Sequence, residues 1–124
     1  MLGMLERNIT NMDKEDCLKT FKLMCDGMVL KQKDMLINSM SKNSNLYHMT
    51  GLKETREEYI KDILDGTLNY FSYEILSFDF DFALVRLEAQ VYSYPKSFWN
   101  LRMNIKYVIE DNKLKISECR VKMG

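Results

Sequence analysis

Apolar residues repeat with a helical period in the first third of the chain. Spacings of three and four residues join one apolar stripe, which predicts an amphipathic helix and consists of Cys17, Phe21, Met24, Cys25 and Met28. Asp13 is the predicted N-cap, with Glu15 and Asp16 in the first turn, where the helix dipole favours negative charge. A second, short helix is predicted from about Asp34, with apolar residues at Met35, Leu36, Ile37 and Met40. The polar residues 41–45 that follow, SKNSN, predict a turn.

The third predicted helix has the clearest ends. Thr55 and Glu58 form a capping box, in which each side chain satisfies a free backbone N–H of the first turn. Gly66 suits the left-handed residue that ends many helices. The predicted buried face consists of Tyr59, Ile60, Ile63 and Leu64. Before this helix, residues 46–50, LYHMT, predict a short strand, which Gly51 ends with a sharp turn.

From Tyr70 onward the period of the pattern changes to two, which predicts strands. In the first strand the residues predicted to share the apolar face are Phe71, Tyr73 and Ile75. In the strands over residues 83–91 and 99–107, those predicted to face the helices are Val85, Leu87, Ala89, Leu101, Met103 and Ile105. The residues predicted to face outward are Arg86, Glu88, Arg102 and Lys106. The last strand changes phase near Ser117 and Glu118, which predicts a bulge.

Each long strand has one apolar face, which the helices must cover. The predicted fold class is therefore α+β, with three N-terminal helices packed on a strongly curved antiparallel sheet. We expect one domain over residues 13–124, preceded by a variable segment over residues 1–12 that carries little pattern.

Composition excludes several classes of function. Lysine plus arginine and aspartate plus glutamate both number 18, so the sequence predicts no basic surface for nucleic acid. No apolar run approaches the length of a membrane span. The three cysteines form no CxxC pair and the chain has one histidine, so neither a metal site nor a cofactor is predicted. The cysteine content and the polar N-terminal residues predict a cytoplasmic protein.

The order of these elements resembles the nuclear transport factor 2-like superfamily over about residues 13–122. Within it, the chain is most similar to small bacterial proteins related to SnoaL-type polyketide cyclases and ketosteroid isomerase. The most specific stretch is YHMTGLKETREEYIKDILDGTLNYFS, residues 47–72. One departure is the segment Asp111-Asn112-Lys113-Leu114, where relatives often have a Gly-x-Trp turn. The resemblance implies a cone-shaped fold with a pocket at its wide end and frequent dimers formed by the outer sheet faces.

His48 is the main candidate for proton transfer, because an unperturbed histidine titrates near neutral pH. In an extended strand, Leu46, His48 and Thr50 share one face. The alternatives are a half-buried histidine bonded to a neighbour, a ligand contact, and a catalytic base.

Other residues have weaker claims to a pocket. The hydroxyls of four tyrosines are candidate donors to a pocket, although such tyrosines are more often core residues with solvated tips: Tyr59, Tyr70, Tyr73 and Tyr107. Trp99 is a candidate pocket floor, for which core packing is an equally good explanation. Asp26 is the single acid near the apolar stripe, and no pair of acids falls on the apolar strand faces. The charged run KETREE, residues 53–58, predicts a solvated surface. The complete set of predicted ligand-binding residues is His48, Thr50, Tyr59, Tyr70, Trp99 and Met103.

Three functions fit these residues. The preferred hypothesis is a protein that binds a small apolar molecule in an apolar pocket. The alternatives are a lyase or isomerase that uses His48 as general base, and a structural dimerisation module with a vestigial pocket. We also expect a homodimer through the outer sheet face, formed by Arg86, Glu88, Gln90, Asn100, Arg102 and Asn104.

Overall fold

The computed structural model describes residues 14–124 of the chain. The predicted N-cap Asp13 and the variable segment 1–12 lie outside the described residues. The elements in chain order are α2 (Lys14–Leu30), α3 (Lys33–Ser39), β1 (Met40–Tyr47), β2 (Lys53–Thr55), α4 (Arg56–Leu64), β3 (Leu68–Asp79), β4 (Phe82–Val91), β5 (Ser97–Glu110) and β6 (Lys113–Met123). The α+β class is confirmed.

The sheet is mixed, which corrects the prediction of an antiparallel sheet. Its six strands have the order β2-β1-β6-β5-β4-β3, and β1 pairs with β6 in parallel. Because β1 covers Met40–Tyr47, residues 41–45 belong to a strand and the predicted turn there is wrong. The pattern concealed this strand because its buried residues include Ser41 and Ser44, which are small but polar.

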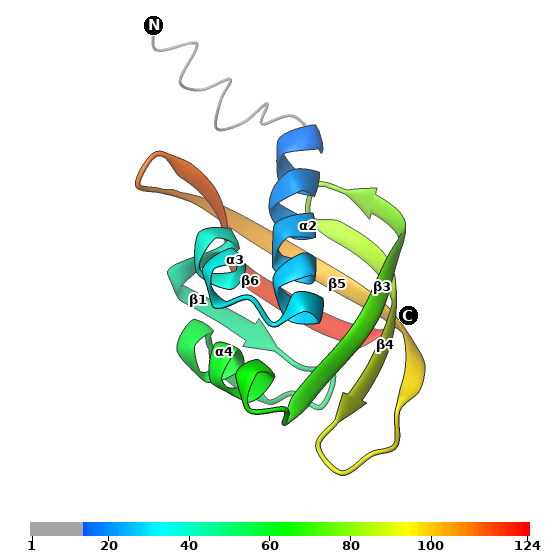
Figure 1. The fold of residues 1–124 in the computed structure, drawn as a ribbon. Helices are drawn as coiled ribbons and strands as arrows, with labels where there is room; N and C mark the ends of the chain where they lie inside the picture. The colour runs from blue at the N-terminus through cyan, green and yellow to red at the C-terminus, as the bar shows by residue number, and fades with distance from the viewer. Residues whose placement is uncertain (1–13) are drawn as a thin grey trace, which may run out of the picture.

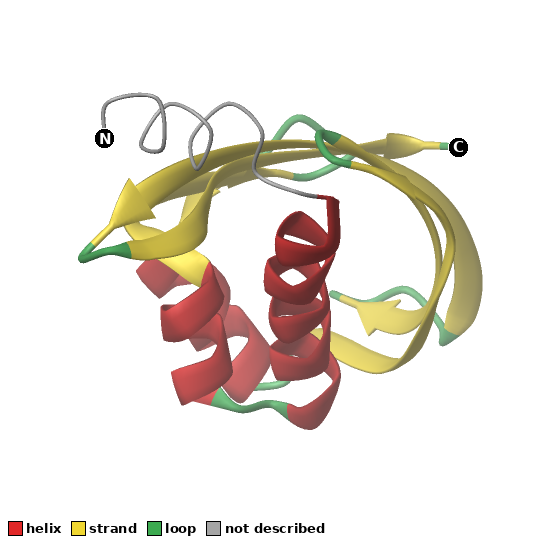
Figure 2. Ribbon diagram, turned by 90° about the horizontal axis from the view of Figure 1, so that it is seen from above, coloured by secondary structure: helices red, strands yellow, loops and turns green. Residues whose placement is uncertain are grey.

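The helices lie on one face of the sheet (Figure 1), and Figure 2 shows the sheet arching over them. α2 packs on β3 and β6, and α4 packs on β1 and β3. Two of these helices precede the first strand, whereas α4 follows β2. Among residues 14–124, no helix has the length and apolar character needed to cross a membrane.

The side chains of β4 and β5 point to the predicted faces of the sheet. All six predicted inward residues are buried. Of the four predicted outward residues, Arg86, Arg102 and Lys106 are exposed and Glu88 is half-buried. Paired residues of β4 and β5 share a face, as Val85 does with Leu101. The core therefore lies between the helices and this alternating face.

Bulges explain where the alternation fails. The register of β3 on β4 shifts between Tyr70 and Ser72, so Phe71 leaves the apolar face and is 40% exposed. On β6, Ser117 has no partner in the ladder, since Ile116 pairs with Tyr107 and Glu118 with Lys106. The predicted bulge near Ser117 is confirmed. Leu64, predicted to be buried, is 48% exposed at the last turn of α4.

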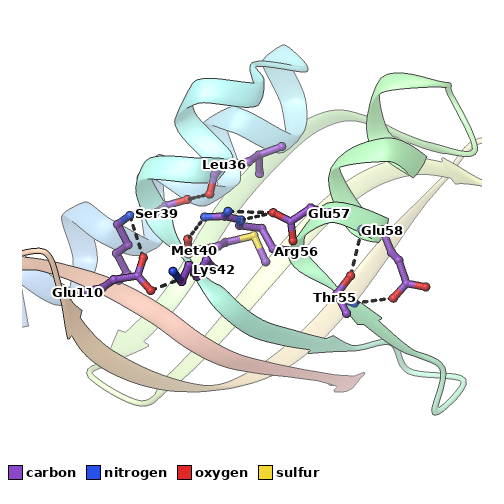
Figure 3. A network of polar contacts seen from close by, with 10 residues as sticks. Leu36, Ser39, Met40, Lys42, Thr55, Arg56, Glu57, Glu58 and Glu110 are labelled. Carbon is purple, nitrogen blue, oxygen red and sulfur yellow. Dashed lines mark hydrogen bonds and ion pairs between the residues drawn. The ribbon is translucent and has the colours of Figure 1, made fainter.

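The start of α4 is held by the network shown in Figure 3. Thr55 accepts a hydrogen bond from the Glu58 backbone, and the Glu58 carboxylate accepts one from the Thr55 backbone, which confirms the capping box. The Arg56 guanidinium donates to the Met40 carbonyl, 3.1 Å away, where α3 meets β1. These contacts connect β2 and α4 to β1. They also hold the backbone next to Glu54, the residue that precedes Thr55.

Candidate functional site

A cavity of about 280 Å³ opens between the helices and one end of the sheet. The strands that line it are β1, β3, β4, β5 and β6, and α2 and α4 contribute from the helix side. Most lining side chains are apolar, and in the described part of the chain the lining includes no lysine, arginine, aspartate or glutamate. Met49, Tyr92 and Tyr94 are exposed and lie where the cavity meets solvent. The cavity therefore suits apolar contact far better than charge pairing.

All six predicted ligand-binding residues line this cavity: His48, Thr50, Tyr59, Tyr70, Trp99 and Met103. Their contact with a ligand stays a prediction. The prediction that His48 and Thr50 belong to a strand is wrong, because they lie one and three residues beyond Tyr47, where β1 ends. The Tyr59 hydroxyl donates to that of Tyr70 across 3.1 Å, and both rings are buried.

Three other candidates lie away from the cavity. Asp26 is not among the lining residues, and its carboxylate accepts a 2.7 Å hydrogen bond from the Tyr73 hydroxyl. The Tyr107 hydroxyl donates to the Phe80 carbonyl at 2.6 Å. Asp26 therefore does not serve as the pocket acid, and neither Tyr73 nor Tyr107 lines the cavity.

His48 is held by a tight loop and by one buried carboxyl group. Its backbone N–H donates to the Leu52 carbonyl at 2.8 Å, and its carbonyl accepts from the Gly51 N–H. Gly51 has φ +91°, a conformation that glycine adopts without strain. The ring nitrogen Nε2 lies 2.5 Å from Oε1 of Glu54, whose side chain is only 6% exposed.

The His48–Glu54 pair is neutral near pH 7. Burial, together with a hydrogen bond and negative charge from Asp62, raises the pKa of Glu54 from 4.5 to about 8. Burial lowers the pKa of His48, and the negative charge of Asp62 opposes that shift. A protonated Glu54 therefore lies against a neutral His48 ring. This arrangement avoids the cost of burying separate charges.

Glu54 and Asp62 are the site residues that the sequence reasoning missed. Glu54 belongs to the run KETREE, which predicted a solvated surface, yet it is 5% exposed. It is the middle residue of β2 and pairs with Leu46, so both side chains point to the buried face. Alternation within Lys53, Glu54 and Thr55 was the available signal, but three residues are too few to show a period.

Comparison with known proteins identifies the fold. No family model matches the sequence, and no curated protein matches it. An NTF2-like protein of unknown function from Prochlorococcus has a similar structure, with a TM-score of 0.70 at 12% identity over 90% of this chain and 93% of that one.

Two further solved structures agree. An NTF2-like protein from Cytophaga hutchinsonii gives a TM-score of 0.64 at 14% identity, over 86% of this chain and 94% of that one. A domain of unknown function with a cystatin-like fold from Nostoc punctiforme gives 0.59 at 11% identity, over 90% and 77% of the two chains. At these identities the likeness establishes the fold.

The protonated state of Glu54 predicts a specific dependence of stability on pH. Its pKa in the folded chain is about 8, against an ordinary value of 4.5, so the folded protein keeps a proton that the unfolded chain has lost. The resulting stabilisation is complete below about pH 4.5 and is lost as the pH rises through about 8. Urea unfolding of the natural chain should show the free energy of unfolding falling from pH 6.5 to 8.5, by at most about 1.4 kcal/mol per pH unit.

The variant Glu54→Gln should lack this fall, whereas Glu74→Gln on the exposed part of β3 should keep it. The lowered pKa of His48 acts in the opposite direction and only below about pH 6.5, outside this window. Equal slopes in the natural chain and Glu54→Gln would contradict the neutral pair.

Proposed function

We propose that this chain uses an NTF2-like fold to bind a small apolar molecule in the cavity that His48 and Trp99 line. The observation that carries the proposal is the cavity itself, about 280 Å³ with almost entirely apolar walls. The sheet arches over the helices (Figure 2), which supports a cone-shaped fold with the cavity at its wide end. A purely structural module with a vestigial pocket is less well supported, because His48 lines a cavity of this size.

The size of the cavity limits the ligand. A cavity of 150 Å³ holds one benzene molecule, so this cavity suits a ligand of roughly a dozen non-hydrogen atoms. Met24, Met28 and Met103 line it and supply flexible, polarisable contacts that adapt to different shapes. We propose that the protein is cytoplasmic and needs no cofactor for this binding.

A lyase or isomerase that uses His48 as general base is the second candidate. The observation that favours it is the 2.5 Å contact between His48 and Glu54 at the cavity, which joins a neutral base to a protonated acid. A ligand that takes up deuterium from heavy water only when His48 is present would support this candidate. A ligand recovered without deuterium supports binding alone.

Ligand binding is measurable through Trp99, which is the single tryptophan of the chain and lines the cavity. Titration with benzylacetone, an uncharged ketone of suitable size, should change Trp99 fluorescence in a saturable manner. His48→Ala should weaken binding about fivefold, as expected for one net hydrogen bond of about 1 kcal/mol. His48→Gln should weaken it less if the role of the ring is hydrogen bonding only.

The control for this titration is Tyr73→Phe, which removes a hydroxyl that bonds Asp26 and does not line the cavity. It should bind as the natural chain does. If benzylacetone and its hydrocarbon analogues all fail to give saturable binding, the proposed function is wrong.

We also propose a homodimer through the outer sheet face. Phe98 is 56% exposed there, and the Arg86 guanidinium lies 4.6 Å from the centre of its ring. The Lys96 ammonium lies 4.3 Å from the ring of Phe71, which is also exposed. Aromatic residues and arginine are enriched at the centres of protein interfaces, which supports this face as the contact.

Light scattering at micromolar concentration should give twice the chain mass of 14.7 kDa. Phe98→Asp should give the mass of one chain, because it places a charge in the proposed contact. Leu30→Asp, at an equally exposed apolar residue that ends α2, should remain a dimer. A natural chain that is monomeric at this concentration would refute the proposal.

A further inference from the structure

The His48 ring has two nitrogen atoms, and only one of them contacts Glu54. Nε2 is bound to the Glu54 carboxyl group. Nδ1 makes no hydrogen bond to any residue in the part of the chain that the structure describes. Both His48 and Trp99 line the cavity, and within residues 14–124 two ring nitrogens there have no hydrogen-bond partner, Nδ1 of His48 and the buried Nε1 of Trp99.

The contact with Glu54 decides whether Nδ1 is a donor. A neutral imidazole has one nitrogen with a proton and one without. When the Glu54 carboxylic acid donates to Nε2, the ring proton must be on Nδ1. If the shared proton moves to the ring instead, both nitrogens carry a proton. Nδ1–H is a donor in both cases, as long as Glu54 supplies that proton.

The charges near the pair disfavour an anionic ligand. Asp62 and Glu58 of α4 act on Glu54, and Asp62 also acts on His48. Tyr70 of β3 and Tyr92, just after β4, face the same carboxyl group. Since the described lining contains no lysine or arginine, a carboxylate ligand would lose its hydration and meet negative charge without a cationic partner.

We propose that the ligand is an uncharged apolar carbonyl compound, that Nδ1–H of His48 donates to its oxygen, and that Glu54 is the positioning residue that keeps His48 in this donor form. This inference rests on the proposed function of the same cavity. It adds the chemical class of the ligand and a residue that acts through His48.

The positioning role predicts a pH profile. As the pH rises through the Glu54 pKa of about 8, the carboxylate requires a donor, so the ring proton moves to Nε2. Nδ1 then becomes an acceptor and repels a carbonyl oxygen. Affinity for a ketone should therefore fall about tenfold between pH 7 and pH 9.5. A hydrocarbon ligand should show no such fall.

Calorimetry at pH 7 with three ligands of equal size tests whether the cavity prefers a carbonyl compound, a hydrocarbon or a carboxylate. They are benzylacetone, the alkene in which a methylene group replaces its carbonyl oxygen, and hydrocinnamate, in which a charged oxygen replaces its methyl group. The ketone should bind about tenfold more tightly than the alkene, and hydrocinnamate should bind most weakly. Glu54→Gln should bind the ketone with no change of affinity between pH 7 and pH 9.5, because an amide does not titrate.

Two substitutions locate the contact on the ring. The amide of His48→Asn lies near the position of Nδ1, whereas that of His48→Gln lies near Nε2. Asparagine should therefore retain more of the preference for ketone over alkene than glutamine does. The alkene affinity serves as the internal control for folding in each variant.

The outcomes are distinct. If none of the three compounds binds, the proposed function fails and this inference fails with it. If ketone and alkene bind equally well, the apolar cavity is a binding site but the assignment of a carbonyl ligand is wrong. Tightest binding of hydrocinnamate, or a pH profile that survives in Glu54→Gln, would also overturn it.

Discussion

Covering the apolar face of a bent sheet is the constraint on which the rest of this structure depends. The strands β3 to β6 each present alternating apolar residues to one side, and that side must leave water. The helices lie under the arch of the sheet (Figure 2), and α2 alone supplies five buried apolar side chains: Cys17, Phe21, Met24, Cys25 and Met28. Toward one end of the sheet, apolar side chains line a cavity of about 280 Å³. The site thus lies within the same apolar layer between the helices and the sheet.

The polar part of the site follows from the same constraint. Glu54 is on β2, next to β1, and its register with Leu46 turns its carboxyl group toward the buried side. A carboxylate there would be costly, so the group keeps its proton where it contacts His48. The capping box at Thr55 begins α4 immediately afterwards and fixes the direction in which Glu54 can point. A local helix-capping signal therefore directly follows the buried acid that contacts His48.

Strong local patterns predicted most of the fold. The stripe from Cys17 to Met28, the capping box at Thr55 and the alternation over residues 83–107 each depend on short-range geometry, and each appears as expected. The strand over residues 41–45 was missed because buried serines break the apolar pattern. Its parallel pairing with β6 depends on segments about seventy residues apart, for example Met40 and Ile116, and no local pattern reports such a contact.

The site was predicted less completely, for a similar reason. Tyr70, Trp99 and Met103 belong to strands whose alternation was evident, and Tyr59 belongs to the predicted buried face of α4, so their place on the cavity follows from local patterns. Glu54 and Asp62 reach the site only through the turn at Gly51 and the packing of α4 on β1. In the sequence they are two acids of a charged surface. Only the tertiary structure shows that one of them is buried and bonded to the single histidine.

The protonation of His48 is the central claim, and nitrogen NMR of isotope-labelled protein tests it directly, because the chain has one histidine and therefore one pair of ring signals. At pH 7 the account predicts a protonated Nδ1 and an unprotonated Nε2, with the proton moving to Nε2 as the pH rises through about 8. A ring that carries its proton on Nε2 at pH 7, with Nδ1 unprotonated, would contradict the account.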